Sequence, residues 1–318
     1  MGLPPYELFA LPRFPVLFLF ALATGGCEDC NGKPLPGSAD AAPAPSASAS
    51  GPSARLVDGG PVNATPVKNE DVLALVNPDK LPAYSGETGS IEGTVTVTGD
   101  LSPPPRFPGD FTKCKEAEAT WGKAFREGPG TATDHRSLAD AVVVVTGYTG
   151  FYVPEKREAA HATIEGCAYT ARTVTLTFGQ RLEVKNNTRE FWTPTLEPGT
   201  NMVLMMAAPK GDAVKIYPKK PGHYLLLDRD RKYSIVDVYA FLHPLHAVTS
   251  TSGTFRIDGV PVGKLKVSTM HPQVSGSDEK EIEISAGGVT KVALSIKSVL
   301  KDAGPLLDED AGYHPKLR

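Results

Sequence analysis

The four cysteines of this chain, Cys27, Cys30, Cys114 and Cys167, are the residues best able to do chemistry, as disulfides or as metal ligands. Cys27 and Cys30 have Cys-x-x-Cys spacing, but no second such pair accompanies them, as a structural zinc site would require. Cys114 and Cys167 lie in the patterned part of the sequence and are the natural pair in an oxidising compartment. Their bridge would close a loop of about fifty residues and stabilise the fold by about 4 kcal/mol. We predict this disulfide, with zinc as the alternative.

Two further groups of side chains could bind a metal ion if the fold brought them together. One group is three histidines, whose imidazoles bind borderline metals: His243, His246 and His271. The other is three methionines, whose thioethers bind Cu(I): Met202, Met205 and Met206. Isolated histidines beside proline are usually structural or exposed, and methionine usually fills a core. We therefore expect neither group to form a metal site and predict no cofactor.

Catalytic motifs are missing from the sequence. It contains no phosphate-cradling glycine-rich loop, no nucleophile elbow and no zinc-protease helix. The formal net charge of -3 gives no reason to expect nucleic acid as a partner. We predict a protein that is not an enzyme.

The first residues are typical of an export signal. Arg13 precedes a short apolar run over residues 15–23, and small residues lead to Cys27, an order that resembles a bacterial lipoprotein signal. We predict a signal peptide over residues 1–26 and lipidation of Cys27, with an ordinary cleaved signal as the alternative. An Ala-, Pro- and Ser-rich sequence then predicts a flexible tether over residues 27–86, with a short helix at 69–76.

The remaining sequence alternates apolar and polar residues in short runs separated by Gly, Pro and Asn, which predicts β-sandwiches. The clearest run is 91–98, where Val95 and Val97 share one face. One helix is expected over residues 113–126. The other predicted strands cover residues 141–145, 173–178, 181–185, 203–206, 214–217, 223–227, 235–241, 253–257, 264–267, 281–284 and 290–296. A mobile tail is expected over residues 299–318.

The stretch from Ala247 to Val267 resembles the second half of a carboxypeptidase-regulatory-like module. Gly253 permits a hairpin, Phe255 and Ile257 point inward, and the turn at residues 261–263 matches the family's Val-Pro-x-Gly. The opening strands of that family appear far upstream. The resemblance therefore implies a discontinuous, transthyretin-like sandwich over residues 87–149 and 243–298, with another domain inserted. Two sequential domains are the alternative.

Residues 150–242 form the predicted insertion, and 164–242 resemble a cupredoxin, a Greek-key β-sandwich. Ile164 to Asn187 is similar to the edge strand, the Gly-Gln turn and the asparagine before the first copper ligand. Pro221-Gly-His-Tyr224 is similar to the Pro-Gly-x-Tyr before the family's cysteine loop. The resemblance implies the fold of this second domain.

The same resemblance implies that the copper site is lost. A blue-copper centre needs two histidines and a thiolate, usually with a weak axial methionine. In the order first histidine, cysteine, second histidine and methionine, these positions are Trp192, Asp228, Arg231 and Ser234. Phe191 and Trp192 lie on the loop where cupredoxins meet partners, so they are candidate partner contacts. The alternative, which we expect, is that Trp192 fills the vacated pocket.

Together these patterns predict an exported, membrane-anchored, all-β lipoprotein of two sandwiches, on the periplasmic or cell-surface side. We expect a binding or assembly module whose partners are the membrane, through the lipid, and an envelope protein or polysaccharide. The alternatives are a metal-handling or electron-transfer protein that uses the methionines and histidines, and a carbohydrate-binding module.

Overall fold

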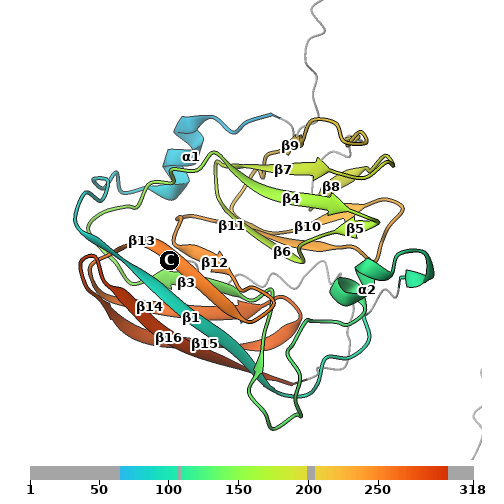
Figure 1. The fold of residues 1–318 in the computed structure, drawn as a ribbon. Helices are drawn as coiled ribbons and strands as arrows, with labels where there is room; N and C mark the ends of the chain where they lie inside the picture. Colours follow the sequence, from blue (N-terminus) through green and yellow to red (C-terminus); the bar gives the residue numbers. More distant parts are fainter. Residues whose placement is uncertain (1–64, 106–108, 199–204, 300–318) are drawn as a thin grey trace, which may run out of the picture. The chain divides into compact units, whose positions relative to one another are not determined.

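The computed structural model describes residues 65–105, 109–198 and 205–299, and β-strands dominate these ranges (Figure 1). The predicted all-β fold class is confirmed. Sixteen strands join into four sheets of four, and each pair of sheets encloses its own apolar core. Within the described ranges, no helix combines the length and the apolar character needed to cross a bilayer. The predicted signal peptide, Cys27 and the tail from residue 300 lie outside the described residues.

The first sandwich is made of strands from both ends of the described chain. In one sheet the order is β13-β1-β16, and β2 also pairs with β1. The bounds are β1 (Thr88–Gly99), β2 (Arg136–Ser137), β13 (Thr254–Pro261) and β16 (Val289–Ser298). In the other sheet the order is β12-β3-β14-β15. The bounds are β3 (Val142–Thr146), β12 (His246–Val248), β14 (Gly263–His271) and β15 (Val274–Ile284).

Strand β1 shows why the sequence adopts this arrangement. Ile91, Val95 and Val97 are fully buried on one face, as the alternation predicts. Gly93 shares that face, and a Cβ atom there would lie 2.6 Å from the ring of Phe255. Glycine is required because β1 runs antiparallel to β13 on one side and parallel to β16 on the other, with this ring packed against its backbone.

The second sandwich is built from the strands between β3 and β12. One sheet has the order β5-β4-β7-β9 and the other β6-β11-β10-β8. The first contains β4 (Ala159–Glu165), β5 (Ala168–Tyr169), β7 (Arg181–Asn186) and β9 (Val214–Ile216). The second contains β6 (Thr173–Thr177), β8 (Pro194–Glu197), β10 (Gly222–Asp228) and β11 (Val236–Phe241). A small cluster with members on both sandwiches joins them, formed by Val142, Val144, Tyr239, Phe241 and Met270.

Two expectations about local structure need correction. The helix expected over residues 113–126 is a short 3₁₀ turn (Phe111–Lys113) followed by α2 (Lys115–Trp121). Helix α2 ends early because the guanidinium of Arg172 donates hydrogen bonds to the carbonyl groups of Thr120, Lys123 and Ala124. The strand expected over 203–206 is not formed at Met205 and Met206, and residues 203–204 lie outside the described part.

The predicted tether also extends too far. Helix α1 (Asn69–Val76) is present as expected, with Glu70 and Asp71 in its first turn. Its Val72 lies against Gly179, and the backbone N–H of Tyr84 donates to the carbonyl of Tyr152. Residues 69–86 therefore belong to the folded body.

Candidate functional site

The four positions assigned to lost copper ligands lie together at one end of the second sandwich. Trp192 precedes β8, Asp228 ends β10, and Arg231 and Ser234 are on the loop to β11. We call these four residues the pocket cluster. The sequence resemblance named the positions, and the structure shows how their side chains contact one another.

Trp192 folds inward and is only 1% exposed. Its backbone exchanges both hydrogen bonds with Ala207, at 3.2 and 2.8 Å, which turns the indole into the core. The ring meets Tyr169 edge-on at 5.6 Å between centroids. Trp192 therefore cannot be a partner contact, and that part of the prediction is wrong because the indole fills the core.

Asp228 is a buried carboxylate held by several donors. One oxygen, Oδ2, accepts from the N–H of Thr193 at 2.8 Å. The other, Oδ1, accepts from the N–H groups of Asp230 and Arg231 at 3.0 and 3.1 Å. The guanidinium of Arg231 also donates to Oδ1, at 3.3 Å. These bonds satisfy both side-chain oxygens of Asp228 and close the loop after β10.

Arg231 supplies the positive charge of the pocket cluster. Its guanidinium carbon lies 4.1 Å from the centroid of the Trp192 ring, which is a cation–π contact. It also donates to the carboxylate of Glu190 at 2.5 Å, on the solvent side. The guanidinium of Arg231 therefore joins Trp192, Asp228 and Glu190.

Ser234 ties the pocket cluster to the neighbouring strand. Its hydroxyl accepts from the backbone N–H of Tyr169 at 2.8 Å, and its own N–H donates to the carbonyl of Arg231 at 3.0 Å. Burial, with the nearby charge of Asp228, raises the pKa of the Tyr169 phenol. Tyr169 is therefore protonated at ordinary pH and acts as a packing residue here.

This donor set does not fit a type 1 copper ion. Arg231 is a permanent cation and the indole of Trp192 has only a donor N–H, so neither is a ligand. The Asp228 oxygens already accept from backbone and guanidinium donors. Because no thiolate or imidazole among the described residues contacts the pocket cluster, we derive no copper chemistry from it.

Phe191 and Met206 are the exposed apolar residues beside the pocket cluster, at 59% and 60% exposure. Phe191 precedes Trp192, and Met206 precedes Ala207. Trp192 and Ala207 pair with each other, and their side chains point into the core. Since side chains alternate along extended chain, Phe191 and Met206 share the outer face of this short ladder. We call them the Phe191–Met206 patch. Met205, in contrast, is buried in the core, as expected for a methionine.

The three candidate histidines do not assemble a metal site. Both ring nitrogens of His246 contact threonine hydroxyls, Thr175 at 3.0 Å and Thr177 at 3.3 Å. The Nδ1 atoms of His243 and His271 accept from nearby backbone N–H groups. In the part of the chain described, none of the three belongs to a group of side chains whose ligand atoms are close enough to share an ion. Burial lowers the pKa of His243 to about 4 and those of His246 and His271 to about 3.

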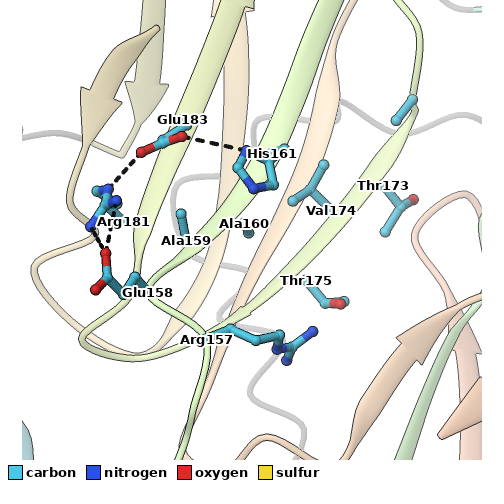
Figure 2. Close-up of a pocket in the computed structure, with 11 residues that line it drawn as sticks. Arg157, Glu158, Ala159, Ala160, His161, Thr173, Val174, Thr175, Arg181 and Glu183 are labelled. Carbon is cyan, nitrogen blue, oxygen red and sulfur yellow. Dashed lines mark hydrogen bonds and ion pairs between the residues drawn. The ribbon is translucent and has the colours of Figure 1, made fainter.

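A groove of about 680 Å³ runs between β4 and β6, and no sequence motif pointed to it (Figure 2). Ala159 and Ala160 leave space along it. The charges around it are paired, because Arg181 contacts Glu158 at 3.1 Å and Glu183 at 2.7 Å. The groove depends on long-range pairing of strands, so only a structure could reveal it.

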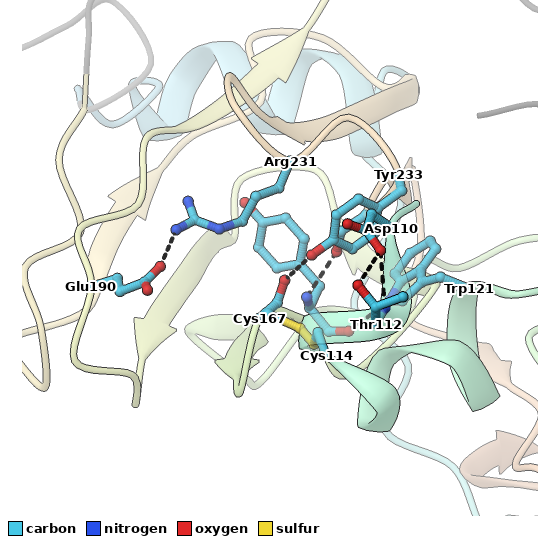
Figure 3. The surroundings of a disulfide bond; sticks show 10 residues. Asp110, Thr112, Cys114, Trp121, Cys167, Glu190, Arg231 and Tyr233 are labelled. Atoms are coloured by element: carbon cyan, nitrogen blue, oxygen red, sulfur yellow. Dashed lines mark hydrogen bonds and ion pairs between the residues drawn. A yellow bond between two sulfur atoms is a disulfide. The ribbon is translucent and has the colours of Figure 1, made fainter. Parts of the chain in front are cut away.

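The disulfide between Cys114 and Cys167 is present, with Cα atoms 6.0 Å apart (Figure 3). It joins the residue before α2 to the turn between β4 and β5. The phenol of Tyr233 donates to the carbonyl of Cys167 at 2.6 Å. Tyr233 is close enough to Arg231 and Asp228 to feel their charges, so the disulfide and the pocket cluster lie at the same end of this sandwich.

No protein-family model matches the chain, and no curated protein sequence matches it. Among solved structures, it is similar to amicyanin from Paracoccus versutus (Thiobacillus versutus), at 18% identity and a TM-score of 0.24. The similarity covers 28% of this chain and 84% of amicyanin. A score this low adds nothing to the fold, which the strand pairing itself shows.

Proposed function

We propose that this protein is a non-catalytic binding or assembly module of the cell envelope. In this proposal its second sandwich is cupredoxin-like without a type 1 copper centre. The observation that carries the proposal is the guanidinium of Arg231, which contacts Trp192, Asp228 and Glu190 within the pocket cluster. A permanent protein cation that is paired in this way opposes the binding of a metal cation at the same place, which supports the proposal.

The Phe191–Met206 patch is the proposed contact with a partner. Large apolar side chains are costly to expose, and clustered ones commonly mark interaction sites. The patch lies beside Trp192 and Ala207, whose side chains are buried in the core of this sandwich. Anchoring through a lipid on Cys27 would hold this surface near envelope proteins or polysaccharide.

Copper loading tests the absence of a metal centre. The intense colour of a type 1 site arises from a Cu–thiolate bond, so copper-loaded protein should show no strong visible absorption. Weakly held Cu(II) on exposed histidines should be pale and lost to a mild chelator. A strong blue band would overturn the proposal.

Partner capture tests the surface. Tagged protein is cross-linked in native membranes, and captured proteins are compared between the parent, Phe191→Ser and Val289→Ser. Val289 is exposed on the first sandwich and serves as the control. Loss of a captured protein with Phe191→Ser alone supports the proposed surface. Equal capture by all three, or retention on polysaccharide resin that Phe191→Ser leaves unchanged, contradicts it.

A further inference from the structure

The side chains of Cys114, Glu116 and Cys167 form a three-ligand cluster around the disulfide. Their ligand atoms, two Sγ and a carboxylate oxygen, all lie within 4.8 Å of one another. Cys114 precedes α2, Glu116 is in its first turn, and Cys167 is in the turn between β4 and β5. Gly166 makes the approach of Glu116 feasible, because a Cβ there would lie 2.5 Å from the carboxylate. We call these three residues the Cys–Glu cluster.

We propose that reduction of the Cys114–Cys167 disulfide converts the Cys–Glu cluster into a binding site for a divalent zinc-like cation. The thiolates of Cys114 and Cys167 and the carboxylate of Glu116 are the protein ligands, and solvent supplies the fourth. This site is separate from the pocket cluster and does not depend on the proposed binding role.

The disulfide must be reduced before zinc can bind. A dithiol or phosphine reductant gives two electrons to the disulfide and is itself oxidised, and the two sulfurs take up two protons to become thiols. Zn²⁺ then displaces both protons and binds the two thiolates. In the oxidised protein the S–S bond leaves neither sulfur as a thiolate, so the oxidised form has no such site.

The arrangement can reach the geometry of a zinc site after reduction. Tetrahedral ligands about 2.3 Å from an ion are roughly 3.8 Å from one another, so the two Sγ atoms, which are bonded in the disulfide, must rotate apart, while a carboxylate oxygen of Glu116 already lies within 4.8 Å of both. Thiolate and carboxylate are both accepted zinc ligands. Glu116 is exposed and Cys167 is partly exposed, so reductant and metal have access, while Cys114 is buried.

The backbone of both cysteines is also held independently of the S–S bond. The N–H of Cys114 donates to the carbonyl of Phe111 at 3.1 Å, and the Cys114 carbonyl accepts from Ala117 at 3.1 Å. The Cys167 carbonyl accepts the Tyr233 hydroxyl, and Phe111 packs edge-on against Tyr233 at 5.4 Å. The two thiols should therefore stay adjacent after reduction, which preorganises the site.

Zinc titration of the full folded chain tests the proposal, with a chromophoric chelator as competitor. Protein reduced with a phosphine and kept from air should bind one Zn²⁺, and oxidised protein should bind none at this affinity. Glu116→Gln should weaken binding by more than the roughly 10–100-fold that loss of an outer-shell partner costs. Glu118, which is also exposed, lies two residues further along α2. Glu118→Gln is therefore the matched control and should bind zinc as the parent does.

Thermal unfolding separates a folded site from binding by loose thiols. Zn²⁺ that binds the native state raises the melting temperature of the reduced protein as its concentration rises, and leaves the oxidised protein unchanged. If reduction alone unfolds the chain, added Zn²⁺ should restore folding in the parent but not in Cys114→Ser. The proposal is overturned if reduced parent binds no zinc, if zinc does not raise its melting temperature, or if Glu116→Gln and Glu118→Gln bind equally.

Discussion

At the residue scale, the pocket cluster is a junction made by protein groups that complement one another. They are a buried carboxylate, a guanidinium and an indole. Arg231 is the most exposed of them and joins the interior to Glu190 at the surface. The sequence resemblance located these four positions. It could not show that Arg231 lies over Trp192, because no local pattern encodes a contact between two loops.

Asp228→Asn should destabilise the second sandwich by about 2–4 kcal/mol, because the amide loses the charge that pairs with Arg231 and turns an N–H₂ toward backbone donors. Urea unfolding monitored by tryptophan fluorescence measures the loss, because both tryptophans, Trp121 and Trp192, lie in the core of this sandwich. Asp230→Asn, at the exposed neighbouring position, is the control and should change stability by less than about 0.5 kcal/mol. Equal effects of the two variants would show that Asp228 does not hold the loop.

Acid should destabilise the protein through its buried histidines. Burial lowers the pKa of His271 to about 3, so the folded protein keeps it neutral while the unfolded chain binds a proton below about 6.5. Between those values the unfolded state holds more protons, so stability is fully present above pH about 6.5 and is lost as the pH falls toward 3. The slope is at most about 1.4 kcal/mol per pH unit for this one group.

His271→Gln removes that titration and keeps an acceptor for the N–H of Gln273. Urea unfolding from pH 6.5 to 4.5 should therefore show a shallower loss of stability than in the parent, whatever the variant's stability at pH 7. His135→Gln, at an exposed position, should leave the slope unchanged. Parallel slopes for His271→Gln and the parent would rule out this contribution.

At the element scale, strands with clean alternation or continuous β-branched residues were predictable. β1, β3, β6, β7, β9, β10, β11, β13, β14 and β16 all occur where expected, within a few residues, except that β13 and β14 extend about four residues further. β15 ends where the strand at 281–284 was expected to end, but it begins at Val274. The strands that were not expected include the two-residue β2 and β5, and three others with weak β propensity of their own. β4 is rich in alanine, β8 begins at proline and β12 has only three residues. They are extended because partner strands pair with them, which is long-range information.

Gly93→Ala tests the close packing of β1. The new Cβ would lie 2.3 Å from the carbonyl of Val292 and 2.6 Å from the Phe255 ring, so β16 or the ring must move. We expect a loss of roughly 1–3 kcal/mol in the free energy of unfolding. Gly288→Ala is the control, because its closest contacts are at 3.3 Å or more. Equal melting temperatures for parent and Gly93→Ala would show that the sheet absorbs the methyl group freely.

At the scale of the whole molecule, strands separated by the second sandwich in sequence are neighbours in the first. β1 pairs with β13 and β16, and β3 pairs with β12 and β14. The first sandwich therefore cannot form until the chain through β16 is available, and the second has its own core. The strands that complete the first sandwich around residues 247–267 therefore lie far upstream in the sequence.

The proposed location of the protein rests on its N-terminal sequence. Residues 15–23 are apolar but too few to span a bilayer, and small residues precede Cys27, so cleavage and acylation at Cys27 are the expected outcome. In lipoprotein processing the cysteine is acylated and the peptide bond before it is then cleaved, so the chain stays held by lipid, whereas an ordinary cleaved signal releases a soluble protein.

Cys27→Ser separates these outcomes. In a bacterial host that processes lipoproteins, the parent should fractionate with membranes and migrate as the shorter, lipid-bearing form on electrophoresis. The variant should either appear as a soluble protein or accumulate as a longer, uncleaved precursor, because the acylated thiol is the substrate for that processing. Cys30→Ser, three residues further on, keeps Cys27 and should behave as the parent does. If Cys27→Ser fractionates and migrates like the parent, the protein is not anchored through this cysteine, and the Phe191–Met206 patch must meet its partner without a lipid tether.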